Sequence, residues 1–397
     1  MCINDVVYLD NAATTYPKPE QVYVRMDEFA RKSCANAGRG GYALGWQADA
    51  CMERTRGLLK ELFHAGENWE VIFSASATFA MNQILFGIQW HSGDVVYVSP
   101  YEHNAVMRPL QKLEERCGVV VKEIPLDKEY KVDTERLAYG CATDHPRLVC
   151  VTAVSNVTGY ILPVAEIAAV VKAENDDTLV VVDASQAAGL VSIDVRTWQA
   201  DALVFAGHKT LYGPFGVGGI IAKREMLERL DDYLIGGTGT DSLRTKMPQE
   251  IPDRFEASSH NTLAIAGLET ALEEIKNLAG SFDASVSLLL QQEQELRRYL
   301  YDSFQNMEHV SCYPAQCEPE KYTGILSFAV DGYEAEDVGD ILDEEYHIAV
   351  RTGYHCAPLI HKHLHSDATK GTVRVSVGRF NNREDIDALV KAVKELQ

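Results

Sequence analysis

The chain has 397 residues, 46% of them hydrophobic and 9% aromatic, which is enough for one large core and a second, smaller one. Its formal net charge of -21 argues against binding to nucleic acid or to a membrane surface, because those partners need clustered Lys and Arg. No apolar stretch approaches the roughly 18 to 20 residues of a membrane span, and the first residues lack the charged region of a signal peptide, so we expect a soluble cytoplasmic protein.

Helical and strand patterns alternate through roughly the first 260 residues. Glu20 to Lys32 and Gln47 to Phe63 are typical of amphipathic helices. Six short apolar runs are typical of buried strands: residues 70–73, 95–98, 119–121, 148–151, 179–182 and 202–205. This alternation indicates βαβ units, and it predicts an α/β fold whose large domain has a mostly parallel sheet flanked by helices.

A long helical stretch after Asn261, rich in Leu, Glu and Gln, marks the passage to a smaller α+β domain. Strands are expected there over residues 325–330, 348–350 and 372–377, with covering helices over residues 334–346 and 383–396. We therefore expect a large domain over residues 16–262 and a small domain built from residues 1–15 and 263–397.

Polar residues follow two neighbouring strands of the predicted sheet. Asp183 and Gln186 come at the end of one run, and His208 and Lys209 come shortly after the next. Residues 213–219, which contain four glycines, are expected to form a tight loop directly after the lysine. A carboxylate and an amine at this edge of a sheet are the two anchors that pyridoxal 5′-phosphate needs, so we expect that cofactor. A structural ion pair of Asp183 and a solvated position of Lys209 are the alternatives.

The turn Ser76-Ala77-Thr78 is the expected phosphate site. It follows the run that ends at Phe73 and opens the next helix, so free backbone N–H groups meet the positive end of a helix dipole there. The alternative is that Ser76 or Thr78 only caps the helix.

Cys356 lies in the segment Arg351-Thr-Gly-Tyr-His-Cys356-Ala. A thiol in a glycine-containing loop, near an arginine and a histidine, has the setting that favours an accessible thiolate. The alternative for a lone cysteine is a small, buried hydrophobic residue. The nine cysteines include no Cys-x-x-Cys pair, so they indicate neither a disulfide framework nor a zinc site.

The chain resembles the class V, fold-type I aminotransferases, and within them the cysteine desulfurases. The likeness rests on Gly207-His208-Lys209 and on the segment from Arg351 to Ala357, which is similar to that of the group of desulfurases that includes the selenocysteine lyase-like enzymes. It extends from Tyr8-Leu-Asp-Asn-Ala-Ala13 to Ser376-Val-Gly-Arg-Phe-Asn381, with the motifs in the family's order. The resemblance therefore implies the fold-type I transferase architecture for nearly the whole chain.

The resemblance implies how the cofactor is held. Lys209 would bond to it covalently, Asp183 would keep its ring nitrogen protonated, and His103 would lie against the ring and shuttle protons. Two positions depart from the family pattern, because Ala77 stands in the phosphate triplet and Ala206 replaces a serine. The implied cofactor contacts are Ser76, Ala77, Thr78, His103, Asn156, Asp183, Gln186, His208, Lys209 and Ser259.

The resemblance also implies the substrate contacts and a homodimer. Arg374 would grip the α-carboxylate of the substrate, with Asn156 and Arg351 as further substrate-binding residues. Asn156 is open to a second role, hydrogen bonding to the ring hydroxyl of the cofactor. Residues 236–239 and 255–262 would reach the active site of the neighbouring subunit. Arg39 falls in a comparable entrance region, where a plain surface turn is equally compatible with the sequence.

The reaction implied is the conversion of L-cysteine to L-alanine, with Lys209, Cys356 and His103 as catalytic residues. Lys209 would remove the α-proton, and Cys356 would attack the substrate sulfur and keep it as a persulfide. A thiol protein or a small thiol would then accept the sulfur. The alternatives are a class V aminotransferase, a lyase acting on L-selenocysteine, or a non-catalytic sulfur-relay partner.

Overall fold

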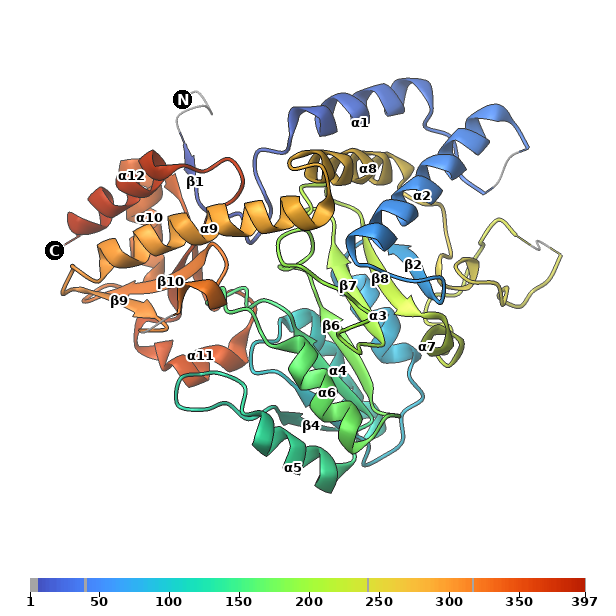
Figure 1. The fold of residues 1–397 in the computed structure, drawn as a ribbon, viewed down its shortest axis with the longest axis horizontal. Coiled ribbons are helices and arrows are strands. Elements are labelled where there is room, and N and C mark those ends of the chain that lie inside the picture. Colours follow the sequence, from blue (N-terminus) through green and yellow to red (C-terminus); the bar gives the residue numbers. More distant parts are fainter. Residues whose placement is uncertain (1–5, 39–40, 241–242, 316–317, 397) are drawn as a thin grey trace.

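Two main sheets and their surrounding helices form the computed structural model, which describes residues 6–38, 41–240, 243–315 and 318–396 (Figure 1). Within these residues the larger sheet has the strand order β2-β8-β7-β6-β5-β3-β4. Its strands are β2 Trp69–Ser74, β3 Val95–Val98, β4 Val120–Glu123, β5 Leu148–Thr152, β6 Leu179–Asp183, β7 Ala202–Ala206 and β8 Gly218–Lys223. Only β8 runs against its neighbours, so the mostly parallel sheet and its six predicted runs are confirmed.

Strand β8 corrects one prediction from the sequence. Residues 213–219 are not a loop throughout, because Gly218 and Gly219 begin this strand. A Cβ atom on Gly218 would lie 2.7 Å from the Phe205 carbonyl oxygen and 2.9 Å from the Ala77 nitrogen, closer than side chains pack. Glycine is therefore required where β8 passes between β7 and the turn at Ala77, and this requirement hides the strand pattern.

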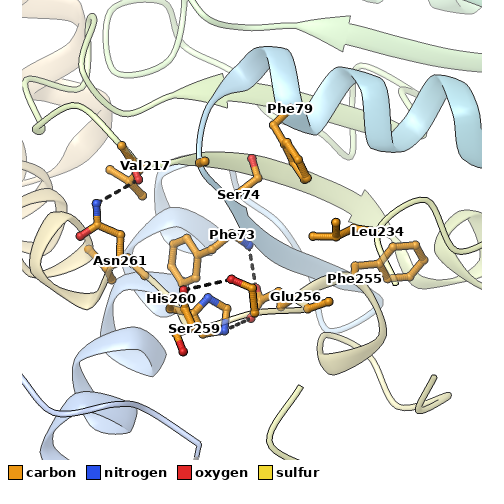
Figure 2. A pocket seen from close by; sticks show the side chains of 15 residues that line it. Phe73, Ser74, Phe79, Val217, Leu234, Phe255, Glu256, Ser259, His260 and Asn261 are labelled. Atoms are coloured by element: carbon orange, nitrogen blue, oxygen red, sulfur yellow. Dashed lines mark hydrogen bonds and ion pairs between the residues drawn. The ribbon is translucent and has the colours of Figure 1, made fainter. Parts of the chain in front are cut away.

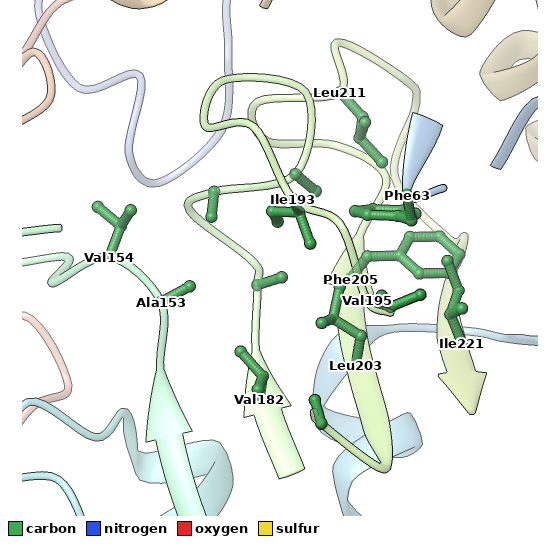
Figure 3. Close-up of a cluster of buried hydrophobic side chains, with 14 of the residues drawn as sticks. Phe63, Ala153, Val154, Val182, Ile193, Val195, Leu203, Phe205, Leu211 and Ile221 are labelled. Carbon is green, nitrogen blue, oxygen red and sulfur yellow. The ribbon is translucent and has the colours of Figure 1, made fainter. Parts of the chain in front are cut away.

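Alternate residues of the larger sheet face two apolar clusters. Val180 and Val182 belong to one cluster and Val181 to the other, as expected for a strand buried on both faces. Figure 3 shows the first cluster around Phe63 and Phe205. The helices that contribute side chains to this cluster include α1 Glu20–Lys32, α2 Ala43–Leu62, α5 Thr134–Asp144, α6 Val164–Glu174 and α8 Thr262–Asn277. The opposite face carries α3 Ala77–Gly87, α4 Asn104–Cys117 and α7 Arg224–Glu228.

The second part of the chain is built on an antiparallel sheet of order β12-β13-β10-β9, next to a two-stranded parallel pair, β1-β11. The strands are β1 Val7–Tyr8, β9 Val310–Tyr313, β10 Ile325–Val330, β11 Ile348–Ala349, β12 Arg351–Gly353 and β13 Thr372–Ser376. The helices are α9 Phe282–Phe304, α10 Ala335–Tyr346, α11 Pro358–Leu364 and α12 Arg383–Lys394. A third apolar cluster fills this part and includes Leu9 from the N-terminal segment.

Helix α8 bears on where the two domains divide. It packs against α1 and α2, and its Ile265, Leu268 and Leu272 lie in the first cluster. We therefore propose that the large domain continues to the end of α8, beyond the boundary expected at residue 262. Helix α9 then runs from α8 to the smaller sheet (Figure 1). In the described part of the chain no helix is long and apolar enough to cross a membrane.

Helix α9 brings a buried carboxyl group, Glu293, to the junction of the two parts. Glu293 lines a small cavity with Thr210 and Thr323, and its Oε2 accepts a hydrogen bond of 3.1 Å from the Gly324 N–H. Burial raises the pKa of Glu293 to about 8. The folded protein therefore keeps a proton that the unfolded chain releases at lower pH.

We expect Glu293→Gln to reduce the loss of stability between about pH 5 and pH 8. Because the folded-state pKa of Glu293 lies above its unfolded value of 4.5, the stability of the wild type should fall as the pH rises between the two values. The amide cannot ionise, so the free energy of unfolding of the variant should fall by on the order of 3 kcal/mol less than that of the wild type over this range. Thermal unfolding of both proteins at the two pH values measures the difference. Glu295→Gln, at an exposed position of the same helix, is the control, and equal pH dependence in all three proteins would contradict the assignment.

Candidate active site

The parallel strands bring four predicted site residues to one edge of the larger sheet. Asp183 ends β6 and Lys209 follows β7, while His103 follows β3 and Asn156 follows β5. Strands β7, β6, β5 and β3 are consecutive neighbours in the sheet, so their carboxyl ends open on the same side. The electrostatic neighbours of Lys209 include Asp183, which lies on the adjacent strand.

The environment of Lys209 lowers the pKa of its amine. Burial lowers the pKa of Lys209 first, Asp183 raises it, and Arg374 and Arg351 lower it further. Asp183 is itself buried, and its Oδ1 accepts a hydrogen bond of 2.9 Å from the Ser185 N–H. A buried carboxylate and an amine with a lowered pKa thus share this edge, as a covalently bound pyridine cofactor requires.

Gln186 is engaged with the N-terminal segment. Its Nε2 donates a hydrogen bond of 2.7 Å to the Ala12 carbonyl oxygen. The sequence places Gln186 among the cofactor contacts, but this contact gives its amide N–H a structural role.

The turn expected to bind phosphate opens helix α3. Ser76 is the N-cap, and its Oγ accepts a hydrogen bond of 3.1 Å from the Phe79 N–H. The capping alternative therefore holds for this hydroxyl group. The backbone N–H groups of Ala77 and Thr78 lie in the first turn, where a helix provides them with no carbonyl partner. An anion site in this turn would therefore be made mainly of backbone groups.

His208 faces Phe215, with ring centroids 4.6 Å apart in a stacked arrangement. Burial, followed by the charges of Lys209 and Lys18, lowers the pKa of His208 to about 4. Its Nδ1 is buried without a hydrogen-bond partner among the described residues. A neutral imidazole with one unused nitrogen is thus placed directly before Lys209.

His103 caps helix α4 through its side chain. Its Nδ1 accepts a hydrogen bond of 3.0 Å from the Ala105 N–H, so the neutral ring carries its proton on Nε2. Burial first, and then the charge of Lys209, lowers the pKa of His103 to about 4. The imidazole is therefore neutral throughout the physiological pH range.

Sequence reasoning gave no role to the carboxyl group of Glu102, which lies beside His103 in the chain. Glu102 is fully buried, and its Oε1 accepts hydrogen bonds of 2.5 Å from the Ser99 hydroxyl and from the Thr152 N–H. Burial raises the pKa of Glu102 to about 8. It ties the end of β3 to the end of β5, and its place next to a predicted site histidine was the available signal.

The Cys356 loop is held on the large domain at two successive carbonyl groups. Asn156 Nδ2 donates a hydrogen bond of 2.7 Å to the His355 oxygen, and the Asn104 N–H donates one of 2.7 Å to the Cys356 oxygen. His355 and Cys356 have φ values of 47° and 59°, in the left-handed region that residues with side chains rarely occupy. These contacts fix the thiol of one domain against the site of the other.

The Cys356 thiol lies beside an arginine, as the sequence indicates. Arg351 Nη2 donates to Cys356 Sγ at 3.3 Å, and Cys356 is partly exposed. His355 does not act in the same way, because its Nε2 bonds with the Thr372 hydroxyl at 2.9 Å and its ring is buried. Burial holds the pKa of His355 well below its usual range. The positive partner of the thiol is therefore Arg351.

Arg374 is buried at the centre of the same region. Its Nη1 donates a hydrogen bond of 3.0 Å to the Asn156 carbonyl oxygen, and its Nη2 forms an ion pair of 2.5 Å with Asp10 Oδ1. Asn156 thus contacts both Arg374 and the loop that carries Cys356. Sequence reasoning used the motif that begins at Tyr8 as a family signature but did not assign a role to Asp10.

Ser259 lines a cavity of about 230 Å³ with Glu256 and His260, and Ser74 and Ala75, which precede the phosphate turn, line the same cavity (Figure 2). The Ser259 hydroxyl accepts a hydrogen bond of 3.3 Å from Asn36 Nδ2. Figure 2 shows Glu256 joined to His260 and to the backbone of β2. The contact expected between Ser259 and a cofactor stays a prediction, and Arg39 lies outside the described residues.

Residues 7–389 match the family model of the class-V aminotransferases. The chain belongs to this family. A probable cysteine desulfurase from Methanothermobacter thermautotrophicus is 32% identical to it over 99% of this chain and 95% of the relative. A cysteine desulfurase from Yersinia pestis is 32% identical over 99% of this chain and 93% of the relative.

The solved structures that this class V chain resembles include further cysteine desulfurases. An apo structure of a cysteine desulfurase from Thermococcus onnurineus matches with a TM-score of 0.89 and 31% identity, over 99% of this chain and 95% of that one. An S-sulfonic acid form of a cysteine desulfurase from Escherichia coli matches with a TM-score of 0.84 and 26% identity, over 99% and 94% of the two chains. The chain therefore belongs to the cysteine desulfurase family, and the predicted family and fold type are confirmed.

Arg351→Met should slow the alkylation of Cys356 by iodoacetamide about ten-fold near neutral pH, because the guanidinium group stabilises the reacting thiolate. Arg351→Lys, which keeps a positive charge, should slow the alkylation of Cys356 less. Peptide mass spectrometry measures the rate at Cys356, with the exposed Cys34 as an internal reference. Equal rates at Cys356 in the wild type and Arg351→Met would show that the arginine does not activate the thiol.

Proposed function

We propose that the protein is a pyridoxal-phosphate-dependent cysteine desulfurase that converts L-cysteine to L-alanine and carries the sulfur as a persulfide on Cys356. One observation carries this proposal: a thiol paired with Arg351 is anchored, through Asn156 and Asn104, at the edge of the sheet that bears Lys209. Membership in the cysteine desulfurase family supports the reaction.

The residues present fit pyridoxal 5′-phosphate. Asp183 would hold the ring nitrogen, and Lys209 would form the covalent bond, for which its lowered pKa is suited. The first turn of α3, from Ala77, would receive the phosphate with backbone N–H groups. The unused Nδ1 of His208 is a buried polar atom that a ligand at this site could satisfy. When bound, the cofactor withdraws electrons from the α-carbon of an amino acid, so that its α-proton can leave.

Each step then falls to a residue of the chain. The amine of Lys209, whose pKa is lowered by burial, accepts the α-proton. The Cys356 thiolate attacks the sulfur of L-cysteine, forming an S–S bond while the bond between Cβ and sulfur breaks and leaves its electron pair on carbon. Protonation of that carbon, together with return of the α-proton from Lys209 to the α-carbon, gives L-alanine, and the sulfur stays on Cys356. His103, which carries its proton on Nε2, is the proposed proton donor.

Substrate binding falls to Arg374 and Asn156. The Arg374 guanidinium would receive the α-carboxylate, for which its planar set of donors is suited. Asn156 contacts the loop through its Nδ2, so this contact does not use its Oδ1. Its backbone carbonyl group accepts a hydrogen bond from Arg374. A thiol protein or a small thiol would then take the sulfur from Cys356, and L-selenocysteine is a further candidate substrate.

Cys356→Ala should retain the cofactor, because its anchors lie on the larger sheet, yet lose formation of alanine and sulfide from L-cysteine by about 100-fold or more. The assay incubates each protein with L-cysteine and a reductant and quantifies both products. Without reductant, mass spectrometry should find one added sulfur atom on the wild-type peptide that contains Cys356. Cys34→Ala, at an exposed cysteine, is the matched control and should keep its activity.

The outcome also separates the alternatives. Desulfurase activity at the wild-type level in Cys356→Ala would rule out the proposed mechanism. Production of pyruvate by the wild type, or transfer of the amino group to a keto acid, would instead identify a different class V reaction.

We propose that the active form is a homodimer in which residues 236–239 and 255–262 meet the second copy. Apolar side chains are exposed beside the first segment, with Ile235 74% and Leu243 99% exposed. Exposed apolar surface of this kind is typical of association sites. A second copy would bring Ser259 of one subunit close to the phosphate turn of the other.

Light scattering of the purified protein should give about twice the mass of one chain, 44.0 kDa. Ile235→Arg should weaken the dimer, because a charge would be buried in an apolar contact. Tyr139→Arg is the matched control, since Tyr139 is 77% exposed on α5 and lies away from these segments. A monomer with full activity at the working concentration would contradict the proposal.

A further inference from the structure

The ion pair between Arg374 and Asp10 places an anion of the chain itself on the proposed carboxylate site. The Arg374 side chain is fully buried, and that of Asp10 is 20% exposed. Arg374 Nη2 donates a hydrogen bond to Asp10 Oδ1, and its Nη1 donates one to the Asn156 carbonyl oxygen. The buried Nε finds no hydrogen-bond partner in the described part of the chain. The guanidinium is therefore only partly satisfied, and a second anion has donors to meet.

The backbone keeps Asp10 in this place. Asp10 pairs with Ser376 in a parallel bridge, and Leu9 and Asn11 on either side donate to the Ala349 and Ser376 carbonyl oxygens. The segment is thus fastened to β11 and to the end of β13, the strand that carries Arg374. Because this backbone is held, the Asp10 carboxylate stays near the guanidinium when a substrate enters.

The charges around this pair explain why an anion is needed there. Arg351 lies directly opposite Arg374 on the antiparallel strands β12 and β13, so both side chains project from the same face. Arg351 contacts the Cys356 thiol, which leaves Arg374 to find another counter-ion. Before substrate binds, Asp10 is the carboxylate paired with Arg374. A bound α-carboxylate would share the guanidinium with Asp10, at the cost of repulsion between two like charges.

We propose that Asp10 is a resident anion that weakens the binding of the substrate carboxylate and so sets the affinity of the site for L-cysteine and for its product. This inference rests on the proposed function, because it takes Arg374 as the carboxylate site. When the site is empty, Asp10 balances the charge of the buried guanidinium. When a substrate binds, the charge of Asp10 repels its carboxylate and so lowers the affinity of the site for it. Weaker binding of the carboxylate also favours release of the product, because L-alanine carries the same carboxylate as the substrate.

The test compares the holoenzyme with its Asp10→Asn variant. Asparagine keeps an oxygen that accepts from Arg374 and removes the negative charge. The KM for L-cysteine and the inhibition constant of propionate, a carboxylate without a reacting group, should both fall about ten-fold, while kcat should not rise. If Asp10 served only to hold Arg374 in place, both constants would rise instead. Asp27→Asn, which removes an equal charge from an exposed pair on α1, should leave both constants unchanged.

Arg374→Gln separates this inference from the proposed function. The variant should weaken inhibition by propionate, whichever role Asp10 has. If propionate inhibits Arg374→Gln as well as it inhibits the wild type, the carboxylate assignment is wrong, and the role of Asp10 is overturned with it. If Arg374→Gln weakens inhibition but Asp10→Asn does not strengthen it, only the role of Asp10 is overturned.

Discussion

The attachment of the Cys356 loop to the larger sheet is the constraint on which the proposed chemistry depends. The thiol belongs to one part of the chain and Lys209 to the other, so their separation is set by the contacts between the parts. Asn156 provides these contacts twice, by donating to the His355 carbonyl group and by accepting from Arg374. The left-handed backbone at His355 and Cys356 shows that the loop takes an unfavourable conformation to present the thiol there.

Burial governs the protonation of the groups around this attachment. Loss of water is the first cause of the lowered pKa values of Lys209 and His103, and neighbouring charges come second. The result is an amine suited to accept a proton and an imidazole that stays neutral. Positive charge gathers at Arg351 and Arg374 instead, where a thiolate and carboxylates are to be stabilised. Burial also strengthens the repulsion between Asp10 and a nearby anion, because little water is present to screen it.

Much of the framework was predictable because its signals are local. The six apolar runs became strands of the larger sheet, and the expected helix from Glu20 to Lys32 matches α1. Strand β8 was missed because the two glycines at its start are typical of a loop, whereas close neighbours on both sides require them in this strand. Helices such as α4 were also missed, and its N-cap, His103, drew attention only as a site residue.

The sequence by itself determined the alternation of strands and helices, the positions of Asp183 and Lys209 at strand ends, and the family of the chain, because each depends on residues close together in the chain or on ordered motifs. Only the tertiary structure decided which partners these residues meet. It turned the His355 ring toward Thr372, engaged Gln186 with Ala12, and paired Asp10 with Arg374. Contacts between residues hundreds of positions apart depend on how the sheets pack together, and no local pattern encodes that packing.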